Sequence, residues 1–509
     1  MLEKIHNKCN ESSALSLTDR NRKEKFIMVN LKSKSTKTLS IVLAFVLLLS
    51  LITFVISPQQ PALAAANPGF VTVYPVEPGA VFSDRYTVFV NNIQVPVYAI
   101  GSDKNVSYAT FDFAGAVTVR VHVNQTVTSY DLSPHGYAVA STVSGQDITF
   151  QMDTPRKLLL KFTGIPEDLC IFGNPPEENP PKIGDAGVTS IMSYGVDNTG
   201  ATNNLTQIQN AINALPANGI LYFPAGSYQA AGILYMKSNT SIYLAGGACI
   251  KAGPYSSTAL QNELQLNFNN VTNMKLFGRG SIDGRGDLQR AKYGGAENGR
   301  TLLQLDSGCN SSYVTIQDII VKDPVVYTAI VMATDHWTVS NYKSVASKTY
   351  SNRDGFDPHN ATNLMFDNNF IYGSDDALAM STTVANLTLN DVFRNSVLVN
   401  NGNGAIFRIG PWISASASGI KMENCDGILS GVNEYAFPIY ASGSLSNVKY
   451  MDNRIQNARS GVFGVYTNWN DYYAGPQNGS LSGVTIDRLY VEQAGNHIYT
   501  APKRPASMY

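Results

Sequence analysis

Three aspartates lie close together in the C-terminal half of the chain: Asp354 and the adjacent pair Asp375 and Asp376. Carboxyl groups that face one another raise each other's pKa, so one can stay protonated while another is ionised. Hydrolysis of a glycosidic bond needs both forms, since one carboxyl group protonates the leaving oxygen and the other directs attack on the anomeric carbon. The same three residues could instead be turn aspartates that cap backbone N–H groups.

The elements that carry these aspartates must be irregular at one point. Neighbouring side chains of a β-strand point to opposite faces, so Asp375 and Asp376 can share a face only at a strand-end turn or a bulge. Gly373 and Ser374 come directly before the pair and permit such a turn. If strands stack in successive turns of a coil, Asp354 would lie one turn earlier, at a strand spacing of about 4.8 Å.

Further polar and aromatic residues surround the aspartates. The candidate substrate-binding residues are Asn352, Asp357, His359, Asn403, Arg408, Trp412 and Tyr435, with Tyr440 and Trp469 as additional aromatic candidates. Arg408 could face a sugar or pair with an acid at a strand edge. Asn352 could hydrogen-bond a sugar hydroxyl or close an Asx turn. Aromatic rings stack on the C–H faces of sugars, but stacked β-structure also buries them in ladders, so each aromatic candidate has both interpretations.

Short β-segments separated by asparagine-rich turns recur irregularly from residue 186 to the C-terminus. No such unit can bury its apolar side alone, so the units are expected to stack into a solenoid, the all-β parallel β-helix. An antiparallel barrel is the alternative, disfavoured because Asn-Gly hairpin turns are scarce. One helix is predicted at the start of this region, with Leu205, Ile208, Ile212 and Leu215 on one face.

Residues 65–172 have a different sequence pattern: short segments alternate apolar and polar residues, as in "VTVRVHV" and "DITFQM". This alternation predicts a small antiparallel β-sandwich domain. The segment 173–185, "GNPPEENPPKIGD", contains four prolines and is predicted to be a linker. The β-helix domain would then occupy residues 186–509.

Residues 1–64 are predicted to be a leader with a secretory signal peptide. Lys32, Lys34 and Lys37 precede the apolar run 39–56, and Ala62-Leu63-Ala64 forms a small-residue cleavage pattern. An uncleaved membrane anchor is the alternative, because the run is long enough to span a bilayer. Met28 is a candidate start, because residues 1–26 do not resemble the beginning of a signal peptide.

Composition excludes some functions. Hydrophobic residues make up 44% and charged residues 15% of the chain, which argues against disorder. After removal of residues 1–64, 28 basic and 34 acidic residues leave a net charge of −6 without a basic cluster, so no nucleic-acid partner is expected. Because the mature chain is acidic overall, binding of an acidic polymer would require cationic side chains at the binding site itself.

The cysteines indicate no metal site. Cys170, Cys249, Cys309 and Cys425 show no zinc-binding spacing, so no metal or cofactor is expected.

Several segments resemble a known enzyme family. "YGVDNTGATNNLTQIQNAINAL" and the following strands resemble the opening of pectin-lyase-like right-handed β-helices, in which a short helix caps the coil. "GRGSIDGRG" at 278–286 and "SNRDGFDPHNATNLMFDNNFIYGSDDALAM" at 351–380 resemble polygalacturonase motifs of glycoside hydrolase family 28. The resemblance includes the 21-residue spacing between Asp354 and Asp375.

The resemblance weakens after residue 400. Asn403 stands where family 28 has the histidine of G-H-G, and Arg408-Ile409-Gly410 lacks the lysine of R-I-K. The segment "NNGNGAIFRIGPW" is more similar to family 49, the dextranases and isopullulanases, which belong to the same clan and also carry an N-terminal β-sandwich. The clan resemblance therefore leaves galacturonan and neutral α-glucan as alternative substrates, with the longer motif match favouring a polygalacturonase-like enzyme.

The resemblance also implies a mechanism. Both families invert the anomeric configuration, and by position Asp375 would be the general acid while Asp354 and Asp376 hold the attacking water. The expected protein is a secreted, monomeric glycosidase that binds polysaccharide. Two other functions are compatible with the fold: a calcium-dependent polysaccharide lyase, for which no suitably spaced basic residue is found, and a non-catalytic glycan binder, which would not need the aspartate pair.

Overall fold

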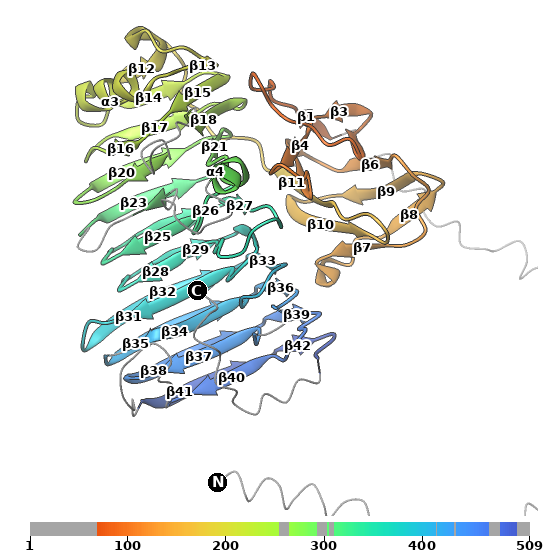
Figure 1. The fold of residues 1–509 in the computed structure, drawn as a ribbon, viewed down its shortest axis with the longest axis vertical. Helices are drawn as coiled ribbons and strands as arrows, with labels where there is room; N and C mark the ends of the chain where they lie inside the picture. The colour runs from red at the N-terminus through yellow and green to blue at the C-terminus, as the bar shows by residue number, and fades with distance from the viewer. Residues whose placement is uncertain are drawn as a thin grey trace, which may run out of the picture. The chain divides into compact units, whose positions relative to one another are not determined.

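The computed structural model describes residues 69–253, 264–292, 303–304, 310–413, 415–431, 434–467 and 479–495. The predicted leader lies outside these residues. Within them the chain forms two packed sheets, in which all strand pairs but one are antiparallel, followed by a parallel β-helix (Figure 1), which confirms the predicted all-β fold class. Among the described residues, no helix has the length and apolarity to cross a membrane.

The N-terminal sandwich consists of two sheets. One contains β1 (Phe70–Thr72), β5 (Val106–Ala114), β11 (Asp168–Asn174), β10 (Arg156–Phe162) and β7 (Tyr130–Ser133) in that order, with β4 (Val97–Ile100) also paired to β5. The other contains β3 (Ile93–Val95), β2 (Tyr86–Val90), β6 (Val117–Val123), β9 (Asp147–Met152) and β8 (Ser141–Ser144). In β6 every second residue is buried, as the alternating sequence predicts. A short 3₁₀ helix, η1 (His135–Tyr137), follows β7.

The β-helix has three long parallel sheets, whose strands lie one above another in Figure 1. The first sheet contains β12 (Val188–Ser190), β14 (Ile220–Phe223), β17 (Ser241–Leu244), β20 (Thr272–Phe277), β23 (Ser312–Gln317), β26 (Thr338–Ser340), β29 (Met365–Asp367), β32 (Leu387–Arg394), β35 (Ala417–Glu423), β38 (Ser444–Met451) and β41 (Ser480–Asp487). The second contains β13 (Thr199–Asn203), β15 (Gly226–Ala230), β18 (Ala248–Ala252), β21 (Ser281–Asp283), β24 (Ile320–Lys322), β27 (Lys343–Val345), β30 (Phe370–Gly373), β33 (Val397–Asn400), β36 (Asp426–Ile428), β39 (Arg454–Gln456) and β42 (Tyr490–Val491).

Within the described ranges, the third sheet has fewer strands than the other two, and the connections that contain the three aspartates lead into it. It contains β22 (Leu303–Gln304), β25 (Ala329–Met332), β28 (Asp357–His359), β31 (Leu378–Thr382), β34 (Phe407–Ile413), β37 (Phe437–Ala441) and β40 (Phe463–Tyr466). A separate pair, β16 (Ile233–Tyr235) with β19 (Gln265–Asn267), lies earlier in the chain. From β20 to β40, each turn of the coil passes from the first sheet to the second and then to the third. The sequence predicts this stacking because each short unit leaves an apolar side unburied.

Asparagines explain the sharp turns between the first and second sheets. Most of these turns place a residue in the left-handed backbone region, which asparagine tolerates better than most residues. The positions with positive φ include Asn341, Asn368, Asn395 and Asn424. Their side chains also bond along the stack, as where Nδ2 of Asn424 donates to Oδ1 of Asn395 at 2.8 Å.

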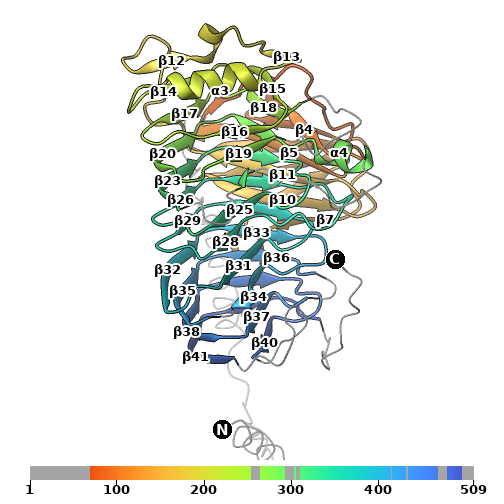
Figure 2. The ribbon, with the colours of Figure 1, turned by 60° about the vertical axis from the view of Figure 1, so that its left-hand side comes forward.

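The predicted helix forms at the first turn of the coil. It is α3 (Leu205–Ala214), preceded by η2 (Ile191–Tyr194), and it buries Ile208 and Ile212 against the apolar interior. Figure 2 shows α3 across the N-terminal end of the stacked strands. A second short helix, α4 (Gly286–Lys292), follows β21.

The sandwich and the β-helix share an apolar interface. Tyr108 and Phe172 of the sandwich form one buried cluster with Phe370 and Tyr372 of the second sheet. The rings of Phe172 and Phe370 are 4.9 Å apart between centroids. A buried ion pair between Lys322 Nζ and Glu77 Oε1, at 2.8 Å, crosses the same interface. Strand β11 extends to residue 174, just inside the segment predicted as a linker, and the domain boundaries themselves stay a prediction.

Candidate active site

The three predicted catalytic aspartates lie in connections that lead from the second sheet to the third. Asp354 lies between β27 and β28, and Asp375 and Asp376 lie between β30 and β31. The backbone N–H of Gly355 donates to the carbonyl oxygen of Asp376 at 2.9 Å, which sets the two connections on adjacent turns. The stacking of strands therefore brings together residues that are 21 positions apart in the sequence.

The strand alternation in the third sheet places other candidates beside them. Ala379 pairs with Arg408, and His359 pairs with Ser381. The intervening Met380 and Ile409 belong to the buried apolar interior of the coil. Because alternate residues point to opposite faces, Asp357, His359 and Arg408 lie on the outer face of the third sheet.

Asp376 pairs with a guanidinium and accepts a backbone N–H. Its side chain is fully buried, and Nη2 of Arg408 lies 2.6 Å from its Oδ2. The backbone N–H of Ala405 donates to its Oδ1 at 2.6 Å. Charge-assisted bonds of this length favour the carboxylate form. Arg408 is thus engaged with the aspartate pair, and its side chain is 17% exposed.

The remaining carboxyl groups lie in a poorly solvated cluster. Burial, followed by the charge of Asp376, raises the pKa of Asp375 to about 7, against the lowering effect of Arg408. Burial and the charges of neighbouring aspartates also raise the pKa of Asp354 and of Asp357 well above their usual range. Burial and the charge of Arg408 lower the pKa of His359 to about 4, so this imidazole is neutral at neutral pH.

Two carboxylate oxygens of the cluster are buried without protein partners. Among the described residues, Oδ1 of Asp354 and Oδ1 of Asp357 receive no hydrogen bond. Buried acceptors are nearly always satisfied in folded proteins, and each exception calls for an explanation, such as a catalytic role or a bound water. These two oxygens lie in the same cluster as Asp375 and Asp376, and this carboxyl cluster is the candidate active site.

The end of β33 and the connection after it support the aspartate pair, and two of their residues, Asn400 and Gly404, were not predicted from the sequence. Nδ2 of Asn400 donates to the carbonyl oxygen of Asp375 at 2.6 Å. A Cβ atom at Gly404 would lie 2.2 Å from the nitrogen of Asp376 and 2.6 Å from Oδ1 of Asp375. Only glycine fits this position without displacement. The glycine-rich segment "NNGNGA" could have indicated a close backbone approach here. Which atoms it approaches depends on the neighbouring turn of the coil.

Two other predicted residues lie at the edge of the cluster. Asn352 has φ of 61°, and its Nδ2 donates to the hydroxyl of Tyr327 at 3.5 Å. Burial and the charge of Asp354 raise the pKa of Tyr327 to about 12. Asn403 is exposed, and its backbone N–H donates to the carbonyl oxygen of Ser374 at 3.4 Å. Tyr327 was missed, since nothing in its local sequence distinguishes it.

The four aromatic candidates are two tyrosines, which both contact Tyr466, and two tryptophans. Tyr435 contacts Tyr466 in a T-shaped arrangement with ring centroids 6.5 Å apart, and Tyr440 stacks on Tyr466 at 4.8 Å. The hydroxyl of Tyr440 donates to Oε1 of Glu434 at 2.7 Å. Trp412 lies in β34, and Trp469 lies outside the described residues.

In the part of the chain that the structure describes, no group of three or more histidine, cysteine, aspartate or glutamate residues is arranged to hold a metal ion. Cys170, Cys249 and Cys425 are buried and unpaired, while Cys309 lies outside the described residues.

Comparisons with known proteins agree with this architecture. The family model of glycosyl hydrolases family 28 matches residues 221–500. An exo-poly-alpha-D-galacturonosidase from Dickeya chrysanthemi is 28% identical over 240 residues, which cover 43% of this chain and 38% of that protein. A polygalacturonase from Gossypium barbadense is 24% identical over 226 residues, which cover 43% of this chain and 54% of that protein. The chain thus spans about half or less of the length of these two relatives.

Among solved structures, Dex49A from Penicillium minioluteum aligns with a TM-score of 0.52 and 14% identity, covering 86% of this chain and 93% of that one. At this identity the likeness concerns the fold alone. The family match is more specific, because it takes up more than half of the chain and contains all three predicted catalytic aspartates. The chain therefore belongs to family 28 of the glycosyl hydrolases.

Proposed function

We propose that this chain hydrolyses α-glycosidic bonds in a polysaccharide with inversion of configuration. The observation that carries the proposal is a carboxyl cluster beside Arg408, formed by Asp357 of the third sheet and by Asp354, Asp375 and Asp376 of the connections that lead into it. A hydrolase of this kind needs one protonated and one ionised carboxyl group in the same place. The cluster combines both, since its members differ in partners and burial.

In the proposed mechanism Asp375 is the general acid. Its raised pKa of about 7 keeps it protonated in mildly acidic solution, and it is only partly buried, so it can reach a leaving-group oxygen. Asp376, paired with Arg408, is the ionised carboxylate, and Asp354 shares with it the placement of the attacking water. Inversion would require the acid and the base to lie about 6.5–9.5 Å apart to admit this water.

The proposed substrate is a galacturonan. The matched relatives are named as galacturonan-cleaving enzymes, and Arg408 can donate two parallel hydrogen bonds to a carboxylate. A neutral α-glucan is the second candidate, favoured by one specific observation: Arg408 already binds Asp376. A site whose nearest guanidinium is engaged attracts a negatively charged sugar less strongly.

A substrate panel tests the proposal. Purified protein is incubated with polygalacturonate, dextran and pullulan, and reducing ends and absorbance at about 235 nm, the unsaturation signal of a lyase, are followed. We expect reducing ends from polygalacturonate without new absorbance and without loss on EDTA treatment. Absorbance that disappears with EDTA would indicate a calcium-dependent lyase. Cleavage of dextran or pullulan alone would select the glucan alternative, and no product from any polymer would indicate a glycan binder.

The proposed inversion of the anomeric configuration is tested by a separate measurement. NMR spectra of the first product are expected to show the anomer opposite to the substrate linkage. Early retention of configuration would contradict the inverting mechanism while leaving hydrolysis itself in place.

We also propose that the protein is secreted as a monomer after cleavage behind Ala64. The support is the basic, apolar and small-residue order of residues 32–64. Expression with the leader should release protein into the medium with an N-terminus at residue 65, and light scattering should give a monomer mass. An N-terminus that still contains the apolar run would indicate the membrane-anchor alternative.

A further inference from the structure

The connection that carries Asp354 is bonded to the N-terminal sandwich. This connection, residues 346–356, joins β27 to β28. The backbone N–H of Lys348 donates to Oδ1 of Asn105 at 2.9 Å, and Nδ2 of Asn105 donates to Oγ1 of Thr349 at 3.0 Å. The Thr349 hydroxyl donates to Oδ2 of Asp103 at 3.1 Å. These sandwich residues belong to the turn 101–105 between β4 and β5.

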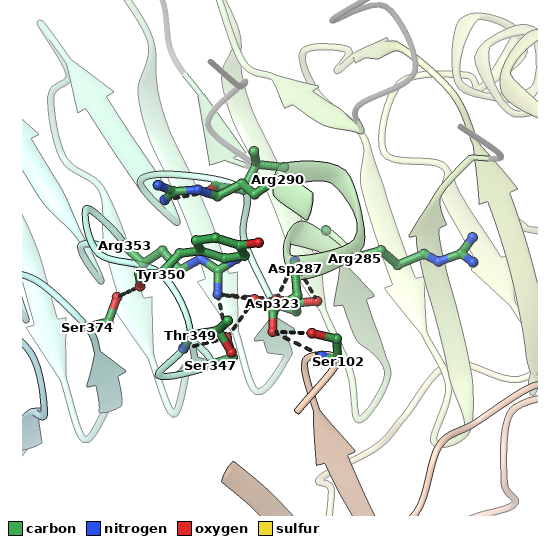
Figure 3. Close-up of polar contacts among 12 residues, drawn as sticks. Ser102, Arg285, Asp287, Arg290, Asp323, Ser347, Thr349, Tyr350, Arg353 and Ser374 are labelled. Carbon is green, nitrogen blue, oxygen red and sulfur yellow. Dashed lines mark hydrogen bonds and ion pairs between the residues drawn. The ribbon is translucent and has the colours of Figure 1, made fainter. Parts of the chain in front are cut away.

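A buried guanidinium continues this contact toward the aspartates. Arg353, which directly precedes Asp354, has no exposed surface. Its Nη1 donates to Oδ1 of Asp287 at 2.6 Å and to Oγ of Ser347 at 2.7 Å. The other oxygen of Asp287 accepts the backbone N–H of Ser102 at 3.0 Å. Figure 3 shows Asp287 between Ser102 of the sandwich and Arg353. One carboxylate therefore joins the sandwich turn to the residue beside Asp354.

The glycine motif at 278–286 explains why Asp287 lies there. A Cβ atom at Gly284 would lie 2.6 Å from the carbonyl oxygen of Asp323, and one at Gly286 would lie 2.1 Å from that of Pro324. These close approaches set the start of α4 against the next turn of the coil. The N–H of Asp287 then donates to Oδ1 of Asp323 at 3.2 Å. Burial alone would raise the pKa of Asp287, but Arg353 and Ser347 hold this pKa below its usual value.

The same connection also supports the aspartate pair. Oγ of Ser374 donates to the carbonyl oxygen of Tyr350 at 2.6 Å, and the N–H of Ser374 donates to the carbonyl oxygen of Arg353 at 3.3 Å. Ser374 directly precedes Asp375. Both aspartate-bearing connections are thus fixed to the segment that Arg353 and the sandwich hold.

We propose that Arg353 is a positioning residue for Asp354 and Asp375, and that the sandwich turn 101–105 is part of the same support through Asp287 and Asn105. This proposal rests on the proposed hydrolase function. A buried ion pair stabilises a fold weakly in net terms, but its bonds fix geometry. Small displacements of reacting groups cost far more rate than stability, so the effect should appear in kcat rather than in KM.

Two variants test the support from its two ends. Asn105→Ala removes both bonds to Lys348 and Thr349 from a partly exposed position, so folding should persist. Arg353→Lys keeps the buried charge but cannot reproduce the paired bonds of the guanidinium. The matched control is Lys104→Ala, in the same turn, where the side chain pairs with Asp84 of the sandwich instead. Steady-state kinetics, thermal unfolding and hydrogen–deuterium exchange of the peptide 346–356 are measured for each.

We expect Asn105→Ala and Arg353→Lys to lower kcat about 10- to 100-fold with little change in KM, and to speed exchange in 346–356. Lys104→Ala should match wild type in both measurements. Unchanged exchange in Asn105→Ala would overturn the support from the sandwich, and faster exchange with wild-type kcat would overturn its role in catalysis. If wild type cleaves no polysaccharide, the proposed function fails, while the exchange data still decide whether the turn holds the connection. Should Arg353→Lys fail to fold, Ser347→Ala, which removes one hydroxyl from the same cluster, replaces it.

Discussion

At the scale of single residues, the two adjacent aspartates of the cluster have different surroundings. Asp376 is fully buried and bound to a guanidinium and a backbone N–H, whereas Asp375 is partly exposed and has a pKa raised to about 7. Adjacent residues of identical type therefore have different partners and different exposure. Their unequal partners, rather than their chemistry, assign the proposed acid and base.

The role of Asp375 leads to a kinetic prediction. Asp375→Asn should lower kcat at least about 1000-fold, because the amide cannot donate the proton that the leaving oxygen needs. In wild type, kcat/KM should fall as pH rises through about 7, where Asp375 loses its proton. Kinetics from pH 4 to 9 check both statements. Retention of more than a tenth of wild-type activity in the variant would remove Asp375 from this role.

The same raised pKa predicts a stability effect. Asp375 binds its proton more tightly in the folded protein than in the unfolded chain, so its contribution to stability is present below about pH 4 and is lost as pH rises to about 7. Asparagine cannot ionise and avoids this loss. The melting temperature of Asp375→Asn, relative to wild type, should therefore increase between pH 4 and pH 7. A difference that is constant or shrinks would contradict the raised pKa.

Of the two roles predicted for Arg408, binding a sugar or pairing with an acid, the structure shows the pairing with an acid. Arg408→Ala would leave the buried Asp376 carboxylate without its guanidinium, a change that typically costs about 3–5 kcal/mol. We expect lower thermal stability and at least about 100-fold lower kcat on any accepted substrate. Wild-type stability with a selective rise in KM for polygalacturonate would show instead that Arg408 serves only the substrate.

At the scale of elements, close backbone contact between successive turns determines the site. Gly404 lies against Asp375 and Asp376, and Asn400 bonds the backbone of Asp375. The end of β33 and the connection after it therefore form a support for the aspartate pair. A glycine and an amide, neither of which does chemistry, fix where the carboxyl groups stand.

Gly404→Ala tests this support. The added methyl group would overlap the nitrogen of Asp376, so the β30–β31 connection must shift, and overpacking of this kind costs about 1–3 kcal/mol. We expect reduced melting temperature and a large loss of kcat. The comparison variant is Gly164→Ala, where a Cβ atom meets nothing within 4 Å and only the left-handed backbone is strained. Equal activity in the two variants would refute the contact argument.

At the scale of the whole described structure, the sandwich and the coil are joined by a buried apolar cluster. Phe172 is fully buried and packs edge-on against Phe370 of the second sheet. Burial of large aromatic side chains is a principal source of stability in such an interface. The sandwich therefore contributes to the stability of the coil as well as to the support of residues 346–356.

Phe172→Ala should lower the free energy of unfolding by about 3–5 kcal/mol through loss of buried area and the cavity left behind. Denaturant unfolding followed by fluorescence measures this change. Phe82→Ala, at a ring that is 43% exposed, is the matched control and should have a small effect. A similarly small effect of Phe172→Ala would mean that the two parts are held mainly by polar contacts.

The sequence by itself determined the class of fold, because hydrophobic periodicity and turn residues act locally. Apolar alternation predicted the sandwich strands, asparagine-rich turns predicted the coil, and the face of Ile208 and Ile212 predicted α3. It also predicted that Asp354 lies one turn before Asp375 and Asp376, because stacked strands bring residues about one repeat apart into neighbouring positions. These features need only short-range information.

Only the tertiary structure decided which partners these residues have. The pairing of Arg408 with Asp376, the approach of Gly404 to Asp376 and the link from Ser102 through Asp287 to Arg353 consist of contacts between residues 28 to 185 positions apart. Such contacts depend on the register between turns and on how the sandwich packs against the second sheet. No local pattern encodes that register, because it results from the combined packing of the whole apolar interior.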